Sequence, residues 1–229
     1  MQTTSPPHTS PTAVHQIVRP MQLTDIPQVM EVEQQSFPTM WPPTAFKREI
    51  QQNRLARYLV AVQRRGDAPP RDDSNGHHTS NGLQRLLGGL RQMWDTDDTS
   101  PEEREELVVG FIGVWMLADE AHVVTIAVRD SHRRRGIGEL LLIAAVETAL
   151  RERQAVVTLE CRVSNTVAIR LYEKYGFQQV GLRPHYYSDN QEDAYILTAE
   201  AITTEAYRQR FEELRGQHRH RWGGYRLDL

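Results

Sequence analysis

The sequence predicts an α/β domain in which strands and helices alternate along most of the chain. Runs of β-branched residues recur between segments whose apolar residues follow a helical period. One such run, residues 120–128, leads through a basic turn into a helix start marked by Gly136 and Gly138. The helix that begins at Ile137 is apolar on nearly every face near its start, so we expect it to pack deeply against a sheet.

The first half of the chain reads as two strands and two helices. Asp25 and Pro27 are typical of a first helical turn, and Thr44 is a good N-cap. Three prolines between residues 37 and 43 exclude regular structure there. In order, these signals predict a strand at 15–19, a helix at 24–35, an irregular segment at 37–43, a helix at 44–53 and a strand at 57–63.

The second half begins with a hairpin and continues with alternating elements. Ser164 is placed to cap one helix, and Gly176 suits the end of the same helix. The expected elements are strands at 107–117 and 120–128, a helix at 137–152, a strand at 155–163, a helix at 165–175, paired strands at 177–182 and 193–198 around a tip at 183–187, and a helix at 201–214.

Composition limits the class of protein. The net charge of −3 gives no general attraction to nucleic acid or to an anionic membrane, so a basic site must be local and we expect no DNA or membrane binding. A single cysteine, Cys161, excludes an intrachain disulfide and suits a reducing cytoplasm. No apolar run is long enough to span a bilayer.

Three segments fall outside the compact pattern. Residues 1–12 are rich in Ser, Thr and Pro and read as a disordered arm. Residues 64–106 interrupt the domain at 13–199 as a mostly disordered insertion, in which residues 83–94 carry a helical apolar stripe. Residues 200–229 form a helical, basic extension that looks appended.

The turn after residue 128 is suited to bind an anion. Arg133, Arg134 and Arg135 supply positive charge, and the start of the following helix supplies free N–H groups and partial positive charge. Gly136 and Gly138 lack the Cβ atoms that would keep a diphosphate from those donors. The alternative is an ordinary connection with a solvated basic turn.

Three longer motifs make the sequence specific. They read EAHVVTIAVRDSHRRRGIG, LECRVSNTVAIRLYEKYGF and GLRPHYYSDNQEDA. Over residues 14–63 and 107–199 the chain resembles the GNAT acetyltransferases and, within them, the RimI family of ribosomal-protein-alanine N-acetyltransferases. The insertion, the extension and Cys161, where the family often has valine, depart from the pattern.

The resemblance implies a mixed, mostly antiparallel sheet with splayed fourth and fifth strands, and acetyl-CoA as co-substrate without a metal. It places the diphosphate on the turn, the pantetheine along the fourth strand, and an oxyanion contact at a backbone N–H near Val128. The implied contact residues are Ile126, Ala127, Val128, Arg133, Arg134, Arg135, Gly136, Ile137, Gly138, Glu139, Asn165 and Tyr172.

The family's catalytic pair, a glutamate base and a tyrosine acid, falls on Glu160 and Tyr172. Strand alternation places Glu160 on the face opposite Cys161, so a packing thiol is favoured over an acetyl-cysteine intermediate. The alternative for Glu160 is a surface carboxylate paired with Arg162. The alternative for Tyr172 is core packing, which is compatible with a hydroxyl that faces a ligand.

The acceptor is expected between the proline-rich segment and the hairpin tip. Phe37 and Trp41 would form an apolar rim, and Tyr186 and Tyr187 would bind the peptide; packing is the alternative for each ring. The histidines, such as those at 77 and 78, lack convincing ligand spacing, so we expect no metal site. The arginines of the basic tail suit RNA or an acidic partner, or a solvated helix face.

By resemblance, the chain transfers acetyl from acetyl-CoA to a protein N-terminus, most directly to the N-terminal alanine of the eighteenth small-subunit ribosomal protein, by direct attack in a ternary complex. One alternative acceptor is a lysine or a small polyamine. Another alternative is a non-catalytic protein that binds acyl-CoA and assembles with a partner.

Overall fold

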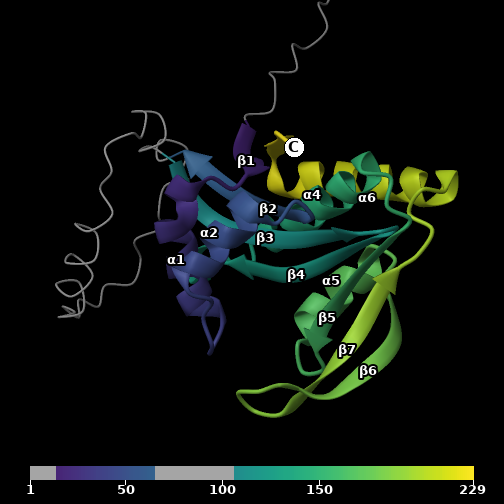
Figure 1. Cartoon of the computed structure of the whole chain (residues 1–229). Coiled ribbons are helices and arrows are strands. Elements are labelled where there is room, and N and C mark those ends of the chain that lie inside the picture. Colours follow the sequence, from purple (N-terminus) through teal and green to yellow (C-terminus); the bar gives the residue numbers. More distant parts are fainter. Residues whose placement is uncertain (1–13, 65–105) are drawn as a thin grey trace, which may run out of the picture.

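The computed structural model describes residues 14–64 and 106–229, which contain one mixed sheet (Figure 1). Its order is β6-β7-β5-β4-β3-β2-β1-β8, and only the β1–β8 and β4–β5 neighbours are parallel within the described residues. This confirms the mixed, mostly antiparallel sheet. The strands are β1 (Val14–Pro20), β2 (Ala56–Arg64), β3 (Glu106–Leu117), β4 (Glu120–Val128), β5 (Val156–Arg162), β6 (Gln178–Tyr187), β7 (Glu192–Ala199) and β8 (Gly224–Leu227).

Helices cover both faces of the sheet (Figure 1). Strand β3 serves both cores: Val108 and Phe111 pack with α1 and α2, whereas Val109 and Ile112 pack with α4. The members of each pair are three residues apart because the β2–β3 register shifts between Ala61 and Val62, which interrupts the alternation. The helices are α1 (Ile26–Ser36), α2 (Pro43–Gln52), α4 (Ile137–Arg151), α5 (Thr166–Lys174) and α6 (Glu205–Trp222), with short 3-10 turns at Leu23–Asp25 and Asp130–His132.

Helix α4 is buried on almost all sides, as its sequence predicts. Leu140, Leu141 and Leu142 have no exposed surface, although they are consecutive and point in different directions. The sheet covers one side of α4, and Phe211 of α6 belongs to the same core on the other. A fully buried leucine contributes about 1.5–3 kcal/mol, so this helix anchors the domain.

Strands β4 and β5 pair only over the first part of their lengths. The parallel register ends at Val123 and Leu159. Beyond this point β4 stays paired with β3 as far as Val128, and β5 stays paired with β7 as far as Arg162. The two strands therefore separate, which confirms the expected splay.

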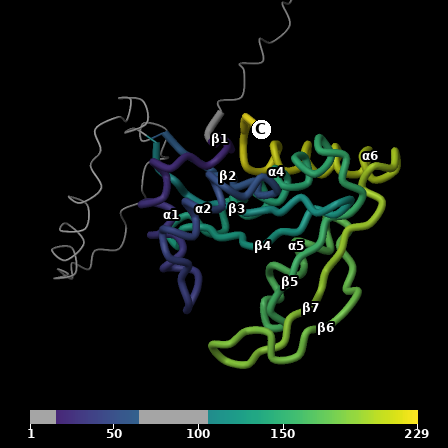
Figure 2. The backbone as a smooth tube through the Cα atoms, viewed as in Figure 1, coloured from purple at the N-terminus to yellow at the C-terminus, as the bar shows by residue number. Residues whose placement is uncertain are grey.

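The C-terminal segment is part of the packed structure. The helix expected at 201–214 is α6, Glu205–Trp222, and β8 then joins the sheet beside β1 (Figure 2). Phe211, Leu214 and Tyr225 are buried in the core that contains α4. The interpretation of this segment as an appended tail is therefore wrong: its polar sequence hid two apolar core side chains on α6 and one on β8.

Several element boundaries also differ from the sequence-based expectations. Helix α2 starts at Pro43, so Thr44 does not cap it, because proline suits the first helical position. Asn165 and not Ser164 caps α5, since its side chain accepts a hydrogen bond from the Ala168 N–H at 3.2 Å. Strand β6 includes residues 183–187, which were expected to form a hairpin tip; the connection to β7 is 188–191.

Two expected segments, the arm at 1–12 and most of the insertion at 64–106 with its apolar stripe, lie outside the described residues. The division into domains thus stays a prediction. None of the described helices combines the length and apolar character that a membrane crossing requires.

The packing of α6 predicts the effect of truncating its buried ring. Phe211 is 2% exposed, so we expect Phe211→Ala to lower the free energy of unfolding by about 3–5 kcal/mol. The control, Glu213→Ala on the exposed face of α6, should change it by no more than about 0.5 kcal/mol. Urea unfolding followed by circular dichroism measures both, and equal stabilities would contradict the packing.

Candidate active site

Glu160 lies where the splay begins. It is the first β5 residue after the last pair with β4, and its side chain is 8% exposed. One carboxylate oxygen, Oε2, is 2.9 Å from His122 Nε2, and the other accepts a hydrogen bond from Arg183 Nε at 2.9 Å. The hydrogen bond with His122 lowers the pKa of Glu160; partial burial opposes this, and the positive charges of His122 and Arg183 support it.

The surface pairing with Arg162, the alternative for Glu160, is wrong. The Arg162 guanidinium instead bonds Asp189 at 2.8 Å and Glu192 at 3.1 Å. It therefore ties β5 to the turn between β6 and β7, and it leaves Glu160 to His122 and Arg183.

His122 of β4 is held between two carboxylates. Its Nδ1 lies 3.4 Å from Glu120 Oε1, opposite the contact of Nε2 with Glu160. The hydrogen bond with Glu160 raises the pKa of His122, and Glu120 adds to the effect, whereas burial opposes it. The ring is thus a titrating group that connects Glu160 to the surface.

Tyr172 of α5 is 5% exposed and packs on Phe177, with ring centroids 5.7 Å apart. Its packing role is therefore real. Burial raises the pKa of the phenol, with smaller contributions from Cys161 and Tyr187, so the hydroxyl stays protonated. No hydrogen bond joins that hydroxyl to another described residue, which leaves it available to a ligand.

Cys161 is buried on the opposite face of β5 from Glu160, as alternation predicts. Burial raises its pKa to about 11, with a smaller contribution from Glu192. A thiol that resists ionisation is a poor nucleophile, which disfavours an acetyl-cysteine intermediate.

The two tyrosines of β6 occupy different environments. Tyr187 is partly buried beneath Arg162, whose guanidinium carbon is 3.8 Å from the ring centroid. Tyr186 is 47% exposed and meets Tyr187 edge-on at 5.2 Å. Arg183 lies 5.7 Å from the centroid of Tyr186, so Tyr186 stands beside the arginine that holds Glu160.

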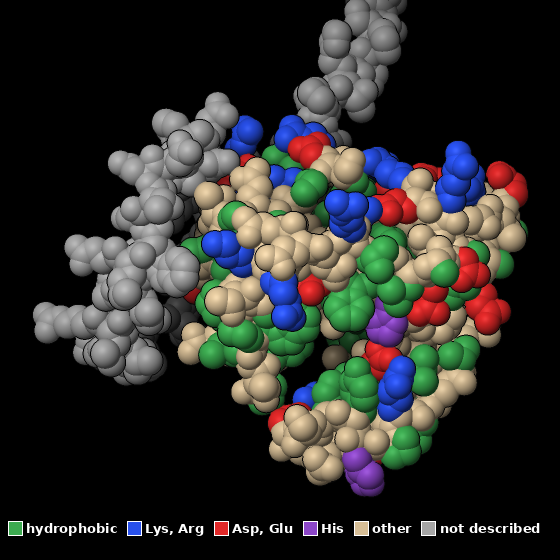
Figure 3. All heavy atoms as spheres, viewed as in Figure 1, with side chains coloured by type: hydrophobic (Ala, Val, Ile, Leu, Met, Phe, Trp, Pro, Cys, Tyr) green, Lys and Arg blue, Asp and Glu red, His purple; other side chains and the backbone are tan. Residues whose placement is uncertain are grey.

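Phe37 and Trp41 lie in the connection between α1 and α2. Both rings are partly buried against the core below α1 and α2, and the ring centroids of Trp41 and Phe46 are 5.8 Å apart. The backbone N–H of Trp41 also donates to Glu33 Oε1 at 3.2 Å. Their packing role is thus established, whereas an acceptor-binding role stays a prediction. Figure 3 shows a hollow in the surface between the part of the molecule that contains α1 and α2 and the arm formed by β6 and β7.

The basic turn requires glycine at position 136. Gly136 has φ of +77°, and a Cβ there would lie 2.6 Å from the Trp222 ring. Its carbonyl accepts a hydrogen bond from buried His218 Nε2 at 3.0 Å. Burial lowers the pKa of His218, which favours the neutral ring. Helix α6 therefore fixes the turn from behind.

The front of the turn is open. At the start of α4, the first N–H that donates to a backbone carbonyl is that of Leu140, which bonds the Gly136 carbonyl at 2.9 Å. No described group accepts from the N–H groups of residues 134–139, which leaves them free for an anion.

Gly138 has no structural requirement for glycine within the described residues. A Cβ at this position would make only an ordinary contact, 3.7 Å from Val128 Cγ2. Alanine is favoured over glycine inside helices by about 0.5–1 kcal/mol, so the glycine reduces stability here. Packing within the described chain therefore gives no reason for glycine at this position.

The three arginines of the turn do not act alike. Arg133 bonds Asp130 at 2.8 Å and the Val128 carbonyl at 3.3 Å, so it stabilises the turn itself. Arg134 and Arg135 are exposed, and no contact with other described residues holds their side chains. These two remain available for a ligand.

The remaining predicted contacts border the same opening. The β5-facing edge of Ile126, Ala127 and Val128 carries no strand partner, because the register with β5 has ended. The Glu139 side chain is held by Lys174 at 2.6 Å and Tyr175 at 2.8 Å. Asn165 is exposed and caps the start of α5, the helix that follows β5.

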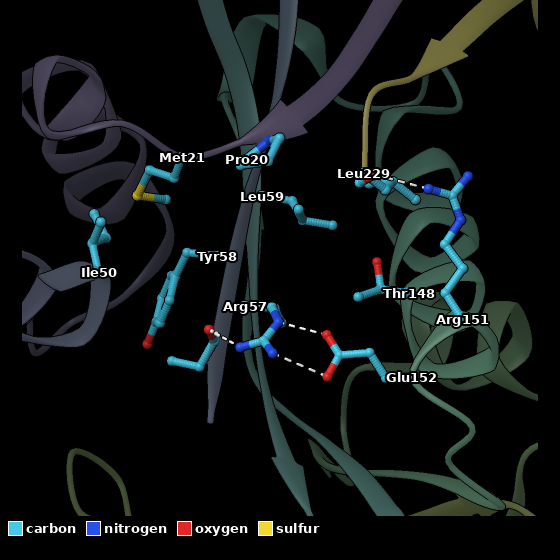
Figure 4. Close-up of a pocket in the computed structure, with 11 residues that line it drawn as sticks. Pro20, Met21, Ile50, Arg57, Tyr58, Leu59, Thr148, Arg151, Glu152 and Leu229 are labelled. Carbon is cyan, nitrogen blue, oxygen red and sulfur yellow. Dashed lines mark hydrogen bonds and ion pairs between the residues drawn. The ribbon is translucent and has the colours of Figure 1, made fainter. Parts of the chain in front are cut away.

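A cavity of about 390 Å³ lies elsewhere, between the end of β1, β2, α4 and the C-terminus. None of the sequence-predicted site residues lines it. Figure 4 shows Arg57 and Glu152 facing one another there, with Arg151 reaching the Leu229 carbonyl. This cavity is therefore distinct from the opening between β4 and β5.

Sequence reasoning missed His122, Arg183 and the α6 contacts to Gly136. His122 and Arg183 stand in the quoted motifs, and alternation along β4 puts His122 on the face of Glu120. The contact of His122 with Glu160 depends on the register of β4 on β5, which brings together residues distant in sequence and has no local sequence signal. Groups of His, Cys, Asp and Glu able to hold a metal are absent from the described residues, and His77 and His78 lie outside them.

Comparisons with known proteins agree on one family. Residues 85–177 match the acetyltransferase (GNAT) family model. A Bacillus subtilis protein is 32% identical over 180 residues, which cover 79% of this chain and 92% of that protein; it is provisionally assigned as a ribosomal protein bS18-alanine N-acetyltransferase. An N-alpha-acetyltransferase of Sulfurisphaera tokodaii is 30% identical over 184 residues, 80% of this chain and 91% of its own.

Among solved structures, Arabidopsis thaliana NAA60 in complex with acetyl-CoA has a TM-score of 0.58 and 18% identity. The match covers 81% of this chain and 98% of that one. At this identity the likeness concerns the fold.

The two turn glycines give opposite stability predictions. We expect Gly136→Ala to lower the free energy of unfolding by about 1–3 kcal/mol or more, because of its positive φ and Trp222. Gly138→Ala, its matched control, should be neutral or stabilise by up to about 1 kcal/mol. Thermal unfolding compares the two, and a destabilised Gly138→Ala would show that the chain itself needs that glycine.

Proposed function

Because the chain belongs to the GNAT acetyltransferase family, we propose that it transfers the acetyl group of acetyl-CoA to the N-terminal α-amine of a protein, with the N-terminal alanine of ribosomal protein bS18 as the favoured acceptor. The observation that carries the proposal is the opening between β4 and β5, with Glu160 at its apex. The names of the two relatives support the α-amine and the ribosomal acceptor, and such an acceptor implies a cytoplasmic enzyme.

The features of the turn support acetyl-CoA as the ligand of the opening. The diphosphate would bind the free N–H groups of residues 134–139, and Gly138 leaves room for it. Arg134 and Arg135 would add charge. The pantetheine would bond the unpaired edge of residues 126–128, with Asn165 facing it. The thioester would then lie near Glu160, and a backbone N–H near Val128 would stabilise the oxyanion.

Glu160 would accept the amine proton. An α-amine has a pKa of about 7.7–8.0 and a lysine amine about 10.4, so near pH 7 roughly a tenth of α-amines are already neutral, against fewer than about one lysine in a thousand. A carboxylate whose pKa is lowered is a weak base. A weak base is sufficient for the α-amine and a poor match for lysine.

Tyr172 would return a proton to the departing thiolate. Its hydroxyl remains protonated because burial raises its pKa, and it is free of other hydrogen bonds among the described residues. A buried phenol delivers a proton only at close range, so its rigid packing against Phe177 favours this role.

The acceptor would enter between Trp41 and the β6–β7 arm. Tyr186 is exposed beside Arg183 and is the better placed of the two tyrosines to meet a peptide. Tyr187 lies under Arg162, near Tyr172, and would set the shape of the site from below. Contact of the basic tail with RNA is not part of this proposal, since Arg210 and Arg215 bond groups of the chain itself.

Acceptor panels test the function directly. Peptides with the acceptor's N-terminal sequence should be acetylated when the α-amine is free and not when it is blocked, although both carry the same lysines. Intact mass spectrometry locates the added acetyl group. Equal acetylation of blocked peptides would overturn the α-amine and favour the lysine alternative.

The proposed roles predict a loss of turnover. Glu160→Gln and Tyr172→Phe should each lower kcat about 100-fold, within the range of general acid–base catalysis, while acetyl-CoA still binds. Glu213→Gln on exposed α6 is the control. Unchanged transfer by the double variant would contradict both roles and leave a protein that only binds acyl-CoA as the better account.

A further inference from the structure

Three side chains form a row from the interior of the splay to the surface. Glu160 Oε2 lies 2.9 Å from His122 Nε2, and His122 Nδ1 lies 3.4 Å from Glu120 Oε1. Their exposed fractions rise along the row, from 8% for Glu160 to 22% for His122 and 40% for Glu120. An ionisable group thus occupies each step between the buried carboxylate and water.

The parallel register of β4 and β5 produces this row. His122 stands opposite Thr158, so Glu160, two residues further along β5, is its diagonal neighbour on the same face. Glu120 is two residues before His122 and shares that face. The order of the three groups is therefore fixed by strands and not by loops.

A proton on Glu160 has a restricted route to bulk water. Each turnover delivers one proton to it, and that proton must leave before the next amine can be deprotonated. The carboxylate is 8% exposed, and both of its oxygens are already bonded, to His122 and to Arg183. Direct exchange with bulk water is therefore restricted, whereas His122 is within hydrogen-bond distance of the carboxylate.

We propose that Glu160, His122 and Glu120 form a proton path, in which His122 relays to solvent the proton that Glu160 takes from the acceptor amine. This rests on the proposed function, since it assigns a route to the proton released by that reaction. His122 acts through Glu160, so it is a positioning and relay residue and need not contact the substrate.

The steps conserve protons. The N–H bond of the amine breaks as an O–H bond forms on Glu160. The relay starts from the His122 tautomer that carries its hydrogen on Nδ1 and leaves Nε2 bare. The O–H bond on Glu160 breaks as an N–H bond forms at Nε2, and the Nδ1–H bond then breaks as its proton passes to Glu120 or to water. The starting tautomer returns when Nε2 gives its proton to water and Nδ1 takes one up, an exchange that leaves the proton count unchanged.

The charges around His122 suit this role. Glu160 on β5 and Glu120 on β4 both raise its pKa. On the other side of Glu160, Arg183 of β6 lowers the pKa of Glu160, and the charge of Glu160 helps to raise the pKa of Tyr186. A pKa above 6.5 brings the His122 ring closer in pKa to an α-amine. The ring accepts the proton only when neutral, so transfer should slow as the pH falls through this raised pKa.

A pH profile separates a relay from a structural histidine. For the native chain, log kcat/KM should fall with a slope approaching two at low pH, because both the amine and His122 must be deprotonated. We expect His122→Gln to lower kcat about 10-fold and the slope to approach one. His220→Gln on exposed α6 is the matched control and should keep the native profile. A native rate and slope in His122→Gln would overturn the relay.

A second measurement needs no acceptor and no altered fold. In an NMR titration of the native full-length chain, the His122 ring should show a pKa above 6.5, and Glu160→Gln should lower it by at least half a unit. Glu120→Gln should lower it less, because its contact is longer. A His122 pKa below 6.5, or one insensitive to Glu160→Gln, would overturn the path. Failure of α-amine acetylation alone would instead overturn the proposed function, since the profile can be repeated on whichever amine is acetylated.

Discussion

The ending of the β4–β5 pairing at Val123 and Leu159 is the constraint on which the site depends. Each strand keeps its other neighbour, β3 or β7, so the sheet stays intact while an edge of backbone inside it loses its partner. Unpaired backbone groups of this kind need an occupant, and an extended ligand can supply one. The same ending places Glu160 at the apex, where its pairing with β7 and the bonds from His122 and Arg183 hold it in one position.

The turn before α4 combines a rigid back with an open front. Trp222 and His218 of α6 hold Gly136, and this contact explains why a C-terminal segment with a polar sequence belongs to the core. The free N–H groups and Gly138 lie in front, where nothing in the described chain uses them. Such preorganisation lowers the cost of binding an anion, because the donors are aimed before the ligand arrives.

Much of the fold could be predicted from local sequence. The apolar helix α4 and the alternation in β5 follow from periodicity, and they were confirmed. The motifs that carry the family resemblance also led to the splay, although no local pattern shows it. The ends of α2, α5 and β6 were wrong, because capping and strand pairing compete locally with several equivalent residues. Phe211 and Leu214 were hidden among charged neighbours on α6, where the apolar face is narrow.

The candidate site divides in the same way. Glu160, Tyr172 and the glycine turn were named from motifs, and the structure brings Glu160 and the unpaired edge of β4 to one opening. His122 and Arg183 were missed because their contacts to Glu160 depend on the offset between strands that are distant in sequence. The ionic state of the carboxylate follows from those contacts, so it was beyond reach of the sequence.

Backbone amide NMR of the native chain, titrated with coenzyme A, tests the central claim most directly. We expect the largest shifts at residues 126–128 and 136–139, the unpaired edge of β4 and the start of α4, with little change around the cavity near Leu229. Shifts concentrated at that cavity, with the β4 edge and the glycine turn unaffected, would contradict the account.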